Sequence, residues 1–397
     1  MTSQNKVKRL LAPEDELDWL GNVLIRSDLN VPISNGNVLD NFRIKKSIEY
    51  IEDLQNISTS ITFTSHLGRP AGFENSLSLK PISDEMSKLL NQDVVFIKNN
   101  LDKEIINILK TKKKGIFLLE NLRFNEGEIN NDEKFAKGVA KPFDTYILDA
   151  FGACHREHAS IVKIGNHLNS FQGPLMSKEI EELDKVLNVS NEDFTIILGG
   201  AKVSDKLALI KNLLPRVNSL LIGGGMCFTF LKALGHNIGN SLCEEEFIES
   251  AKEILDSTDG KKITLPVDFG VTKAIESHAR NNIELSQFSD DDIGVDIGKE
   301  TIKKFQEILS KSKTIFWNGP MGVFEVDEFS HGTKEITNAI AEMEAYSIVG
   351  GGDSVNAINK FSSTDKFNHV STGGGASLEY LEGKSLPGVN IYNQLII

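Results

Sequence analysis

Short apolar runs alternate with amphipathic stretches along almost the whole chain. In the first half the apolar runs are residues 23–25, 61–64, 94–97, 116–119 and 145–148. In the second half they are residues 195–198, 220–222, 263–267, 314–317, 346–349 and 369–371. Strands of this length alternating with helices indicate βαβ units and parallel sheets covered on both faces. The pattern predicts an α/β protein with two doubly wound parallel-sheet (Rossmann-like) domains, each binding ligands at the carboxyl ends of its strands.

The pattern is interrupted between residues 171 and 191. Gly173 and Pro174 break it, and residues 176–187 have acidic side chains on one side of a helix and Leu or Val on the other. We expect this helix to connect the two domains.

Four predicted strands of the second half end in adjacent glycines. Three of them run into three glycines, at residues 223–225, 350–352 and 373–375, and the fourth runs into Gly199 and Gly200. Glycine amides can approach a ligand closely, and a helix N-terminus carries roughly half a positive charge. One triple glycine can be a loose turn. Four in the same strand-turn-helix setting predict a surface for a polyphosphate.

The common nucleotide-binding motifs are absent. A Walker A motif ending at Gly383, Lys384 and Ser385 would need glycine where Leu378 stands. The dinucleotide fingerprint needs a third glycine where the glycine runs have residues 228, 355 and 378. The sequence therefore supports neither a classical P-loop nor an NAD site.

Two further motif matches are weak. Asp268, Phe269 and Gly270 spell the metal motif of protein kinases, but the His155–Arg156 pair is followed by glutamate where such kinases have aspartate, so we interpret the match as chance. His155 and His158 lack further ligands at zinc spacing.

Composition narrows the class of protein. With 397 residues the chain can form two or three domains, and a net charge of −13 argues against nucleic acid as a general partner. Neither a signal peptide at residues 1–9 nor an apolar run of membrane-spanning length is present, so we expect a cytoplasmic protein. The three cysteines have no disulfide or zinc spacing and are expected to be reduced thiols.

The arginines are few and unevenly placed. Only eight of the 43 basic residues are arginine. Four of these stand where a predicted strand ends or a helix begins: Arg43, Arg69, Arg123 and Arg156. A single arginine is usually a solvated surface residue. Because arginine binds carboxylates and phosphates bidentately, the positioned set predicts a site for a small anion.

Other polar residues extend both sites. Asp28, Asn30 and His66 follow predicted strands of the first half, and Asp28 with Asn30 could bind a hydroxyl. In the second half, Lys202 and Lys206 could face one ligand if a helix begins near them.

Two carboxylates complete the picture in the second half. Glu325 follows a tight turn and could bind ribose hydroxyls. Asp353, beside Ser354 at a predicted helix start, would ordinarily be an N-cap, but next to a phosphate cradle a carboxylate is the natural Mg²⁺ ligand.

The chain resembles the phosphoglycerate kinase family over nearly its whole length. The resemblance rests on the ordered segments RSDLNVP, HLGRP, ENLRF, AFGACHREH, GGAKVSDK, GGGMCFTFLKALG, WNGPMGVFE, GGGDSVNA and STGGGASLEYLEGKSLPGV. It implies that residues 1–172 with a returning tail, 383–397, bind 3-phosphoglycerate or 1,3-bisphosphoglycerate. It also implies an interdomain helix at 173–190 and a domain at 191–382 that binds Mg-ADP or Mg-ATP.

The resemblance also implies a role for individual residues. The 3-phosphate would meet His66, Arg69, Arg123 and Arg156, and the glycerate end would meet Asp28, Asn30 and Arg43. Lys202 would stabilise the moving phosphoryl group, Lys206 the nucleotide phosphates, Glu325 the ribose and Asp353 the Mg²⁺. Further nucleotide contacts are expected from Gly200, Gly224, Asn318, Pro320, Gly322, Gly351, Gly352 and Ser354. Catalysis is expected from Arg43, Lys202, Gly352 and Gly375.

Some positions depart from the commonest family pattern. Ser27 replaces a frequent Val, Cys154 and Glu157 replace frequent Ala near Arg156, Ser354 replaces Thr, and Lys299 replaces Pro. Ser354 keeps the hydroxyl, whereas Glu157 would weaken anion binding if it pointed inward.

A non-catalytic nucleotide-binding protein and a different two-domain kinase are the alternatives. Lys202 and Arg43 argue against the first, and the paired HLGRP and ENLRF segments against the second. Transfer from an acyl phosphate needs positioning and charge stabilisation without a covalent intermediate or general base. With its two ligands on different domains, the enzyme would close by a hinge near residues 176–187, and the family leads us to expect a monomer.

Overall fold

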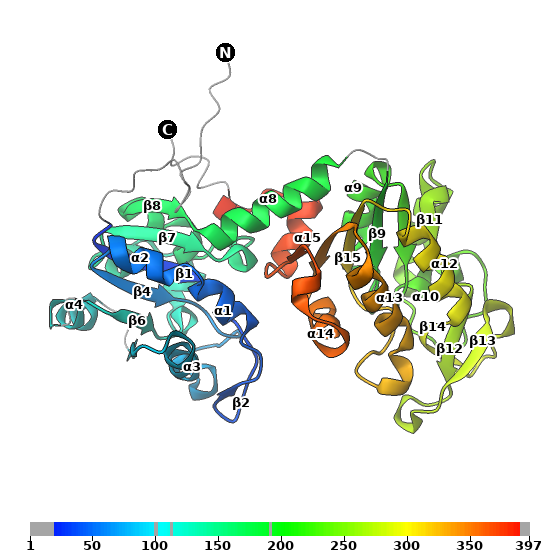
Figure 1. Cartoon of the computed structure of the whole chain (residues 1–397), viewed down its shortest axis with the longest axis horizontal. Coiled ribbons are helices and arrows are strands. Elements are labelled where there is room, and N and C mark those ends of the chain that lie inside the picture. Colours follow the sequence, from blue (N-terminus) through cyan, green and yellow to red (C-terminus); the bar gives the residue numbers. More distant parts are fainter. Residues whose placement is uncertain (1–19, 99–101, 112–113, 190–192, 390–397) are drawn as a thin grey trace, which may run out of the picture. The chain divides into compact units, whose positions relative to one another are not determined.

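The computed structural model describes residues 20–98, 102–111, 114–189 and 193–389 (Figure 1). The chain divides into two compact units, the first formed by Met1–Glu181 and Ser385–Ile397 and the second by Glu182–Lys384. Helix α8 (Pro174–Asn188) runs from the first unit into the second. Two predicted segments lie outside the described residues: residues 1–9, where no signal peptide is expected, and residues 390–397, the last eight of the expected tail.

The first unit is built on a six-stranded sheet in which every pairing is parallel. Its strand order is β5-β6-β4-β1-β7-β8. The strands are β1 (Asn22–Ser27), β4 (Ser60–Thr64), β5 (Val94–Ile97), β6 (Ile116–Leu119), β7 (Thr145–Asp149) and β8 (Asn169–Gln172). The first five match predicted runs. The edge strand β8 was not predicted, because its sequence, Asn-Ser-Phe-Gln, contains a single apolar residue.

Short helices join these strands. They are α1 (Phe42–Ile48), α2 (Ile51–Ile57), α3 (Lys80–Leu90), α4 (Asp102–Thr111), α5 (Glu126–Ile129), α6 (Glu133–Ala140) and α7 (Ala159–Val162), with 3₁₀ turns η1 (Asn75–Leu77), η2 (Leu122–Phe124), η3 (Phe151–Ala153) and η4 (Ile164–His167). A hairpin of β2 (Ile33–Ser34) and β3 (Asn37–Val38) follows β1. Ile44 of α1, Leu54 of α2 and Ile82 of α3 pack with Ile25 and Phe63 of the sheet in one buried core.

The second unit repeats this plan. Its parallel sheet has the order β11-β10-β9-β15-β16-β17, and neighbouring strands β9 and β15 mark the point where the strand order reverses. The strands are β9 (Phe194–Leu198), β10 (Ser219–Ile222), β11 (Ile263–Thr264), β15 (Thr314–Asn318), β16 (Tyr346–Gly350) and β17 (His369–Val370). β11 is shorter than the predicted 263–267. The two parallel sheets confirm the predicted fold class.

The helices of the second unit follow its strands. They are α9 (Leu207–Leu213), α10 (Cys227–Ala233), α11 (Ile248–Asp256), α12 (Lys299–Leu309), α13 (His331–Glu342), α14 (Gly352–Phe361) and α15 (Gly375–Leu381). The 3₁₀ turns are η5 (Leu214–Arg216), η6 (Glu245–Phe247), η7 (Gly260–Lys262), η8 (Ile275–Ser277), η9 (Leu285–Gln287), η10 (Asp327–Phe329) and η11 (Thr364–Lys366). Phe305 of α12, Ile336 of α13 and Ile358 of α14 pack on Trp317 of β15. Figure 1 shows α12 and α13 side by side.

An antiparallel sheet in the second unit was not predicted. Its order is β13 (Asn281–Glu284), β12 (Asp268–Thr272) and β14 (Ile293–Ile297). β12 contains the kinase-like Asp268–Phe269–Gly270 run. The Asp268 carboxylate accepts hydrogen bonds from the backbone amides of Glu300, at 3.0 Å, and Thr301, at 2.8 Å, so in this structure it caps the first turn of α12.

The tail segment after residue 384 packs in the first unit. Leu386 is buried, and the Gly388 amide donates to the Cys154 carbonyl at 3.0 Å. A Cβ on Gly388 would lie 2.7 Å from the Cys154 sulfur. The close approach requires glycine here and fixes this part of the tail against the loop that follows β7.

Candidate active site

Polar side chains gather after four neighbouring strands of the first sheet. Asp28 and Asn30 follow β1, His66 and Arg69 follow β4, Arg123 lies in η2 after β6, and Arg156 follows β7. Carboxyl ends of parallel strands meet at one edge of a sheet, and this topology is what brings the four loops to a common edge. Arg43, the second residue of α1, reaches the same group through Asp28.

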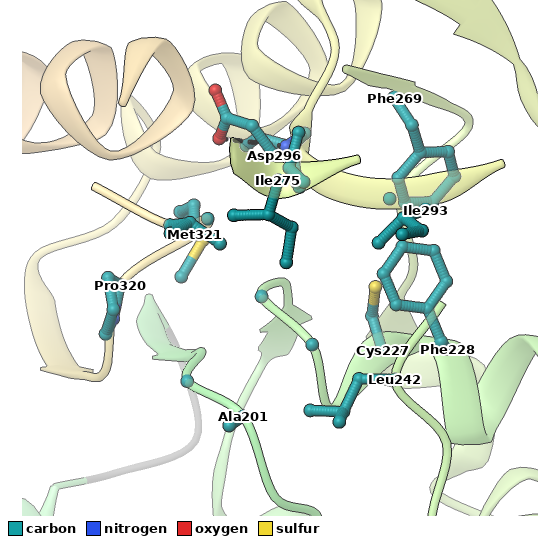
Figure 2. A pocket seen from close by; sticks show the side chains of 18 of the residues that line it. Ala201, Cys227, Phe228, Leu242, Phe269, Ile275, Ile293, Asp296, Pro320 and Met321 are labelled. Carbon is teal, nitrogen blue, oxygen red and sulfur yellow. Dashed lines mark hydrogen bonds between the residues drawn. The ribbon is translucent and has the colours of Figure 1, made fainter. Parts of the chain in front are cut away.

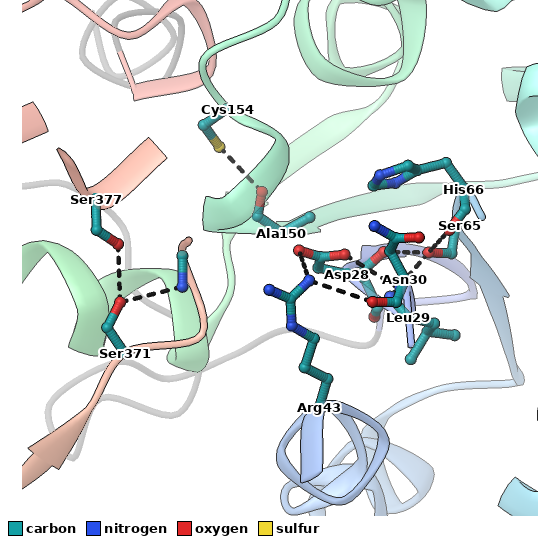
Figure 3. A network of polar contacts seen from close by, with 12 residues as sticks. Asp28, Leu29, Asn30, Arg43, Ser65, His66, Ala150, Cys154, Ser371 and Ser377 are labelled. Atoms are coloured by element: carbon teal, nitrogen blue, oxygen red, sulfur yellow. Dashed lines mark hydrogen bonds and ion pairs between the residues drawn. The ribbon is translucent and has the colours of Figure 1, made fainter. Parts of the chain in front are cut away.

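Asp28, Asn30 and Arg43 form one connected network (Figure 3). A guanidinium nitrogen of Arg43 lies 2.9 Å from the Asp28 carboxylate and 3.4 Å from the Asn30 carbonyl oxygen. The Asn30 side-chain oxygen accepts from the Gly68 amide at 3.0 Å, which ties the β1 loop to the β4 loop. The Asp28 side chain is only 7% exposed, whereas that of Arg43 is 27% exposed. The Arg43 cation therefore remains accessible to a ligand.

Arg26 and Arg156 both lie within electrostatic reach of Arg123 deeper in this site. His66 is buried, and burial followed by the charge of Arg26 holds its pKa well below the ordinary value. Arg123 donates to the Gly68 carbonyl at 2.6 Å, and burial with Arg26 and Arg156 lowers its pKa to about 10. Burial with Arg123 and Arg26 likewise lowers the pKa of His158 to about 4. Mutual repulsion of this kind favours an anion.

The two outer arginines are more accessible. Arg69 is exposed, and Arg156 is half-buried within electrostatic reach of Arg123. Glu157, flagged in the sequence as a possible hindrance, is exposed. One buried arginine of this region, Arg26, was missed as a functional residue, because the sequence does not show which arginine lies inside the unit.

A glycine-rich cavity of about 430 Å³ lies at the carboxyl edge of the second sheet. Loops after β9, β15, β16 and β17 contribute to it. Its lining includes Gly200, Lys202, Lys206, Asn318, Gly351, Gly352, Asp353, Ser354 and Gly375. Predicted residues from four separate segments thus line one cavity.

The two lysines reach this cavity differently from the prediction. Helix α9 begins only at Leu207, so the two lysines do not share a helix face and the condition of the prediction is not met, yet both line this cavity. Lys202 is exposed in the loop. Lys206 is buried, donates to the Gly199 carbonyl at 2.5 Å, and has its pKa lowered to about 8 by burial. The loop, held by this contact, presents both lysines to the cavity.

The start of α14 leaves the Asp353 carboxylate to the cavity. Gly351 is the N-cap residue, with a φ of 92° that favours glycine, and no side chain caps the helix. The Ser354 hydroxyl accepts from the Gly319 amide at 2.7 Å, and the Asn318 side chain donates to the Gly350 carbonyl at 2.8 Å. Asp353 is therefore not the ordinary N-cap considered from the sequence.

The last glycine run is preceded by Ser371, whose hydroxyl is hydrogen-bonded to that of Ser377 of α15 at 2.8 Å (Figure 3).

An apolar cavity of about 300 Å³ adjoins the glycine-rich one (Figure 2). Six predicted residues line it: Gly200, Gly224, Pro320, Gly322, Glu325 and Asp353. The remaining wall was missed, since it comes largely from the unpredicted antiparallel sheet and from α10: Phe228, Phe269, Ile275, Ile293 and Asp296. The Phe228 and Phe269 rings lie 5.1 Å apart. The sequence contained one indication of this wall, the Asp268–Gly270 run, because its Phe269 lines the cavity.

The two cavities form one site. Gly200, Ala201 and Asp353 line both of them. An apolar cavity joined to a cationic, glycine-rich one suits a ligand with a flat apolar base at one end and phosphates at the other. The geometry therefore indicates a nucleotide site.

A family model described as phosphoglycerate kinase matches residues 17–384. The chain belongs to the phosphoglycerate kinase family. It is 47% identical over 374 residues to the phosphoglycerate kinase of Dictyoglomus turgidum, covering 93% of this chain and 94% of that one. It is 47% identical over 379 residues to that of Finegoldia magna, covering 94% and 96%.

Solved phosphoglycerate kinase structures share its fold. The enzyme of Coxiella burnetii superimposes with a TM-score of 0.83 at 37% identity, covering 96% of this chain and 98% of that chain. The enzyme of Pyrococcus horikoshii gives a TM-score of 0.84 at 33% identity, covering 96% and 97%. Members of this family are nucleotide-dependent phosphotransferases of glycolysis, and this assigns the chain its class, EC 2.7.2.3.

Two glycines of the second unit can be tested without disturbing the fold. A Cβ on Gly352 or Gly375 would meet nothing within 4 Å, and both residues begin helices. We expect Gly352→Ala and Gly375→Ala to fold at least as stably as wild type, because alanine is the better helix former. We expect kcat/KM for ATP formation to fall by about 10-fold or more, since the methyl group would occupy the place that the sequence predicts for a phosphate.

Gly138→Ala is the matched control for these variants. Gly138 lies in α6 of the other unit, and its Cβ would also meet nothing within 4 Å. Its kcat/KM should equal that of wild type. Thermal melts and steady-state kinetics check all three, and unchanged kinetics of both site variants would contradict the placement of phosphates at these amides.

Nucleotide binding by the protein should be accompanied by the uptake of a proton at alkaline pH. Burial lowers the Lys206 pKa to about 8, and a bound phosphate would favour the charged ammonium. Above pH 8 the affinity for ADP should therefore fall with rising pH, by up to about 10-fold per pH unit. Calorimetry in buffers of different ionisation enthalpy measures the uptake.

Lys206→Arg supplies the control for that measurement. An arginine stays charged across this range, so the variant should bind ADP with little pH dependence between pH 7.5 and about 9.5. If wild-type affinity were independent of pH over the same range, Lys206 would not contact the phosphates.

Proposed function

We propose that the strand-end residues of the first unit bind the phosphoglycerate and that the joined cavities of the second bind the nucleotide. The reaction is the reversible, Mg²⁺-dependent transfer of a phosphoryl group from the acyl phosphate of 1,3-bisphosphoglycerate to ADP, giving 3-phosphoglycerate and ATP. The observation that carries the proposal is the separation of two anion sites of different kinds, a cluster of arginines with Asp28 in one unit and an apolar cavity joined to a glycine-rich one in the other.

Within the first unit, the polar residues divide between the two ends of the substrate. His66, Arg69, Arg123 and Arg156 bind the 3-phosphate. Asp28 accepts a hydrogen bond from the substrate hydroxyl, and Asn30 and Arg43 bind the carboxyl end. The ion pair between Arg43 and Asp28, at 2.9 Å, supports this division, because it fixes a cation beside a hydroxyl acceptor.

Within the second unit, the base occupies the apolar cavity and the phosphates lie over the glycine turns. Glu325 binds the ribose hydroxyls, and Lys202 and Lys206 bind the phosphates. The neighbouring amides of Gly200, Gly224, Gly351 and Gly352 and the residues Asn318, Pro320, Gly322 and Ser354 shape the cradle. Positive φ values at Gly200, Gly224 and Gly351 support this arrangement, since only glycine adopts such turns without strain.

The residues present fit a magnesium ion that arrives with the nucleotide. Asp353 lines both cavities, and Mg²⁺ is commonly held by one or two carboxylates together with substrate phosphates. Among the described residues, no group of three or more His, Cys, Asp or Glu side chains could hold a metal ion by itself. When bound, the ion would neutralise phosphate charge.

The transfer itself needs little chemistry from the protein. An ADP oxygen is already anionic, so no general base is required, and charge spreads over the phosphoryl oxygens in the transition state. Lys202, Arg43 and the amides of Gly352 and Gly375 stabilise that charge. Lys202 is exposed at the cavity, which supports its assignment to the moving group.

The oligomeric state and the cellular location complete the proposal. The enzyme acts as a monomer, as the family resemblance leads us to expect, and neither proposed ligand site needs a residue from a second copy of the chain. It acts in the cytoplasm, where its glycolytic substrates are. Separately, no helix in the described part of the chain is long and apolar enough to cross a membrane.

A coupled assay tests the function. ATP formation is followed from 1,3-bisphosphoglycerate and ADP, with Mg²⁺ or with a chelator in its place. Activity should require Mg²⁺ and both substrates. A folded, Mg²⁺-supplied sample that binds ADP but forms no ATP would instead establish a non-catalytic nucleotide-binding protein.

A further inference from the structure

A fully buried arginine lies behind the anion site of the first unit. Arg26, on β1, has no exposed surface. Its three nitrogens donate to three different groups: Nε to the Ser160 hydroxyl at 2.9 Å, Nη1 to the Ser27 carbonyl at 2.5 Å, and Nη2 to Nδ1 of His66 at 3.0 Å. With its nitrogens engaged in this way, Arg26 contacts His66 and has no surface to offer a ligand.

The buried charge of Arg26 is compensated through a serine. The Ser160 hydroxyl accepts from Arg26 and donates to the Glu128 carboxylate at 2.6 Å, and the Ser160 amide donates to the other Glu128 oxygen at 2.9 Å. Glu128 and Ser160 are both fully buried. Such a chain holds the guanidinium in one orientation, because every member has its partner.

The contact with Arg26 decides which His66 nitrogen carries the proton. A guanidinium has donors only, so Nδ1 of His66 must be the acceptor and the neutral ring carries its hydrogen on Nε2. After burial, the charged and titratable groups with the largest effect on His66 are Arg26 of β1, Arg123 of η2, His158 before α7 and Arg43 of α1. None is an acid, so nothing among them favours an imidazolium.

We propose that Arg26 is a positioning residue that holds His66 as the neutral Nε2–H tautomer. The ring then offers the substrate phosphate a fixed hydrogen-bond donor in place of a charge that titrates near neutral pH. The role of His66 as a phosphate ligand rests on the proposed function, whereas its tautomer follows from the contacts within the unit. Arg26, Ser160 and Glu128 act through His66 without touching the ligand.

Nuclear magnetic resonance of the ring nitrogens tests the tautomer in the full-length, ligand-free protein. The chain has eight histidines, and the His66 signals are assigned by their loss in His66→Ala. We expect His66 to stay neutral with the hydrogen on Nε2 from pH 5.5 to about 8. An imidazolium at pH 6, or a hydrogen on Nδ1, would overturn the proposal regardless of any substrate.

Kinetics test whether Arg26 acts through His66. Arg26→Gln combined with Glu128→Gln removes both buried charges together, and Glu128→Gln alone is the matched control. In the double variant the KM for 3-phosphoglycerate at pH 7.5 should rise about 10-fold, as expected for one hydrogen bond to a charged group, with a smaller change in kcat. The KM for ATP should not change.

The pH profile distinguishes positioning from a loss of structure. In the double variant the pKa of His66 should return toward its ordinary value of 6.5, so the ratio of its KM to that of wild type should fall as the pH falls through that value. A ratio independent of pH would contradict the proposal. Taking a ratio cancels the ionisation of the substrate.

A mutant cycle completes the test. In a His66→Ala background the two glutamine substitutions should raise the KM no further. Additive effects would show that Arg26 acts independently of His66 and would overturn the proposal. If His66→Ala alone left the KM unchanged, the phosphate role of His66 would fail, while the resonance experiment would still decide the tautomer.

Discussion

Replacing Lys202 with alanine is expected to lower kcat for ATP formation by on the order of 100-fold or more. The side chain is exposed at the glycine-rich cavity, so its ammonium can follow the phosphoryl group during transfer. Charge on the phosphoryl oxygens is greatest in the transition state, and the loss should therefore appear in kcat more than in the KM for either substrate. Steady-state kinetics in the coupled assay measure both.

Lys252→Ala is the control for Lys202→Ala. Lys252 is an exposed lysine of α11 in the same unit, and its replacement changes the net charge equally. It should leave kcat within about twofold of wild type, and neither variant should shift the free energy of unfolding by more than ~0.5 kcal/mol. A Lys202→Ala enzyme with wild-type kcat would remove Lys202 from the mechanism.

Replacing Arg43 with alanine is expected to lower kcat/KM for 3-phosphoglycerate by about 100-fold. Two effects combine in this loss. The substrate loses a charged hydrogen-bond donor, and the Asp28 carboxylate, 7% exposed and 2.9 Å from Arg43, is left without this cation beside an anionic ligand. Kinetics in the direction of 3-phosphoglycerate phosphorylation measure the effect.

The second effect can be isolated. Adding Asp28→Asn to Arg43→Ala removes the charge that repels the ligand. The KM for 3-phosphoglycerate should therefore fall part of the way back toward the wild-type value, although the acceptor for the substrate hydroxyl is weakened. Lys46→Ala, on the same helix, is the control, because Lys46 pairs with Glu49 at 2.6 Å and lies outside the Asp28 network. If the double variant bound 3-phosphoglycerate more weakly than Arg43→Ala alone, the hydrogen bond accepted by Asp28 would favour binding by more than its negative charge opposes binding.

The sequence was sufficient for the parallel sheets and for the edges where ligands bind. Buried strands such as β6, Ile-Phe-Leu-Leu, and β10, Ser-Leu-Leu-Ile, are nearly continuous apolar runs that stand out from amphipathic helices. Once the sheets are parallel, residues that follow strands must share an edge, and this is why loops far apart in the chain line one cavity.

The sequence was insufficient where local pattern and tertiary packing disagree. β13, Asn-Asn-Ile-Glu, has one apolar residue and pairs with β12, so the pattern did not reveal the antiparallel sheet whose other strands, β12 and β14, line the apolar cavity. The four-residue spacing of Lys202 and Lys206 resembles a helical repeat, yet Lys206 is drawn inward to the Gly199 carbonyl and α9 starts after it. Arg26 resembles any other arginine until its burial is known.

The return of the tail to the first unit has a consequence for synthesis on the ribosome. Domains generally fold in the order in which they emerge. Here Leu386 and Gly388 pack in the unit whose strands are translated first, against the loop that carries Cys154. That unit must therefore wait for almost the whole polypeptide before its packing is complete, and a chain stopped at residue 384 would carry its defect in the half that was made earliest.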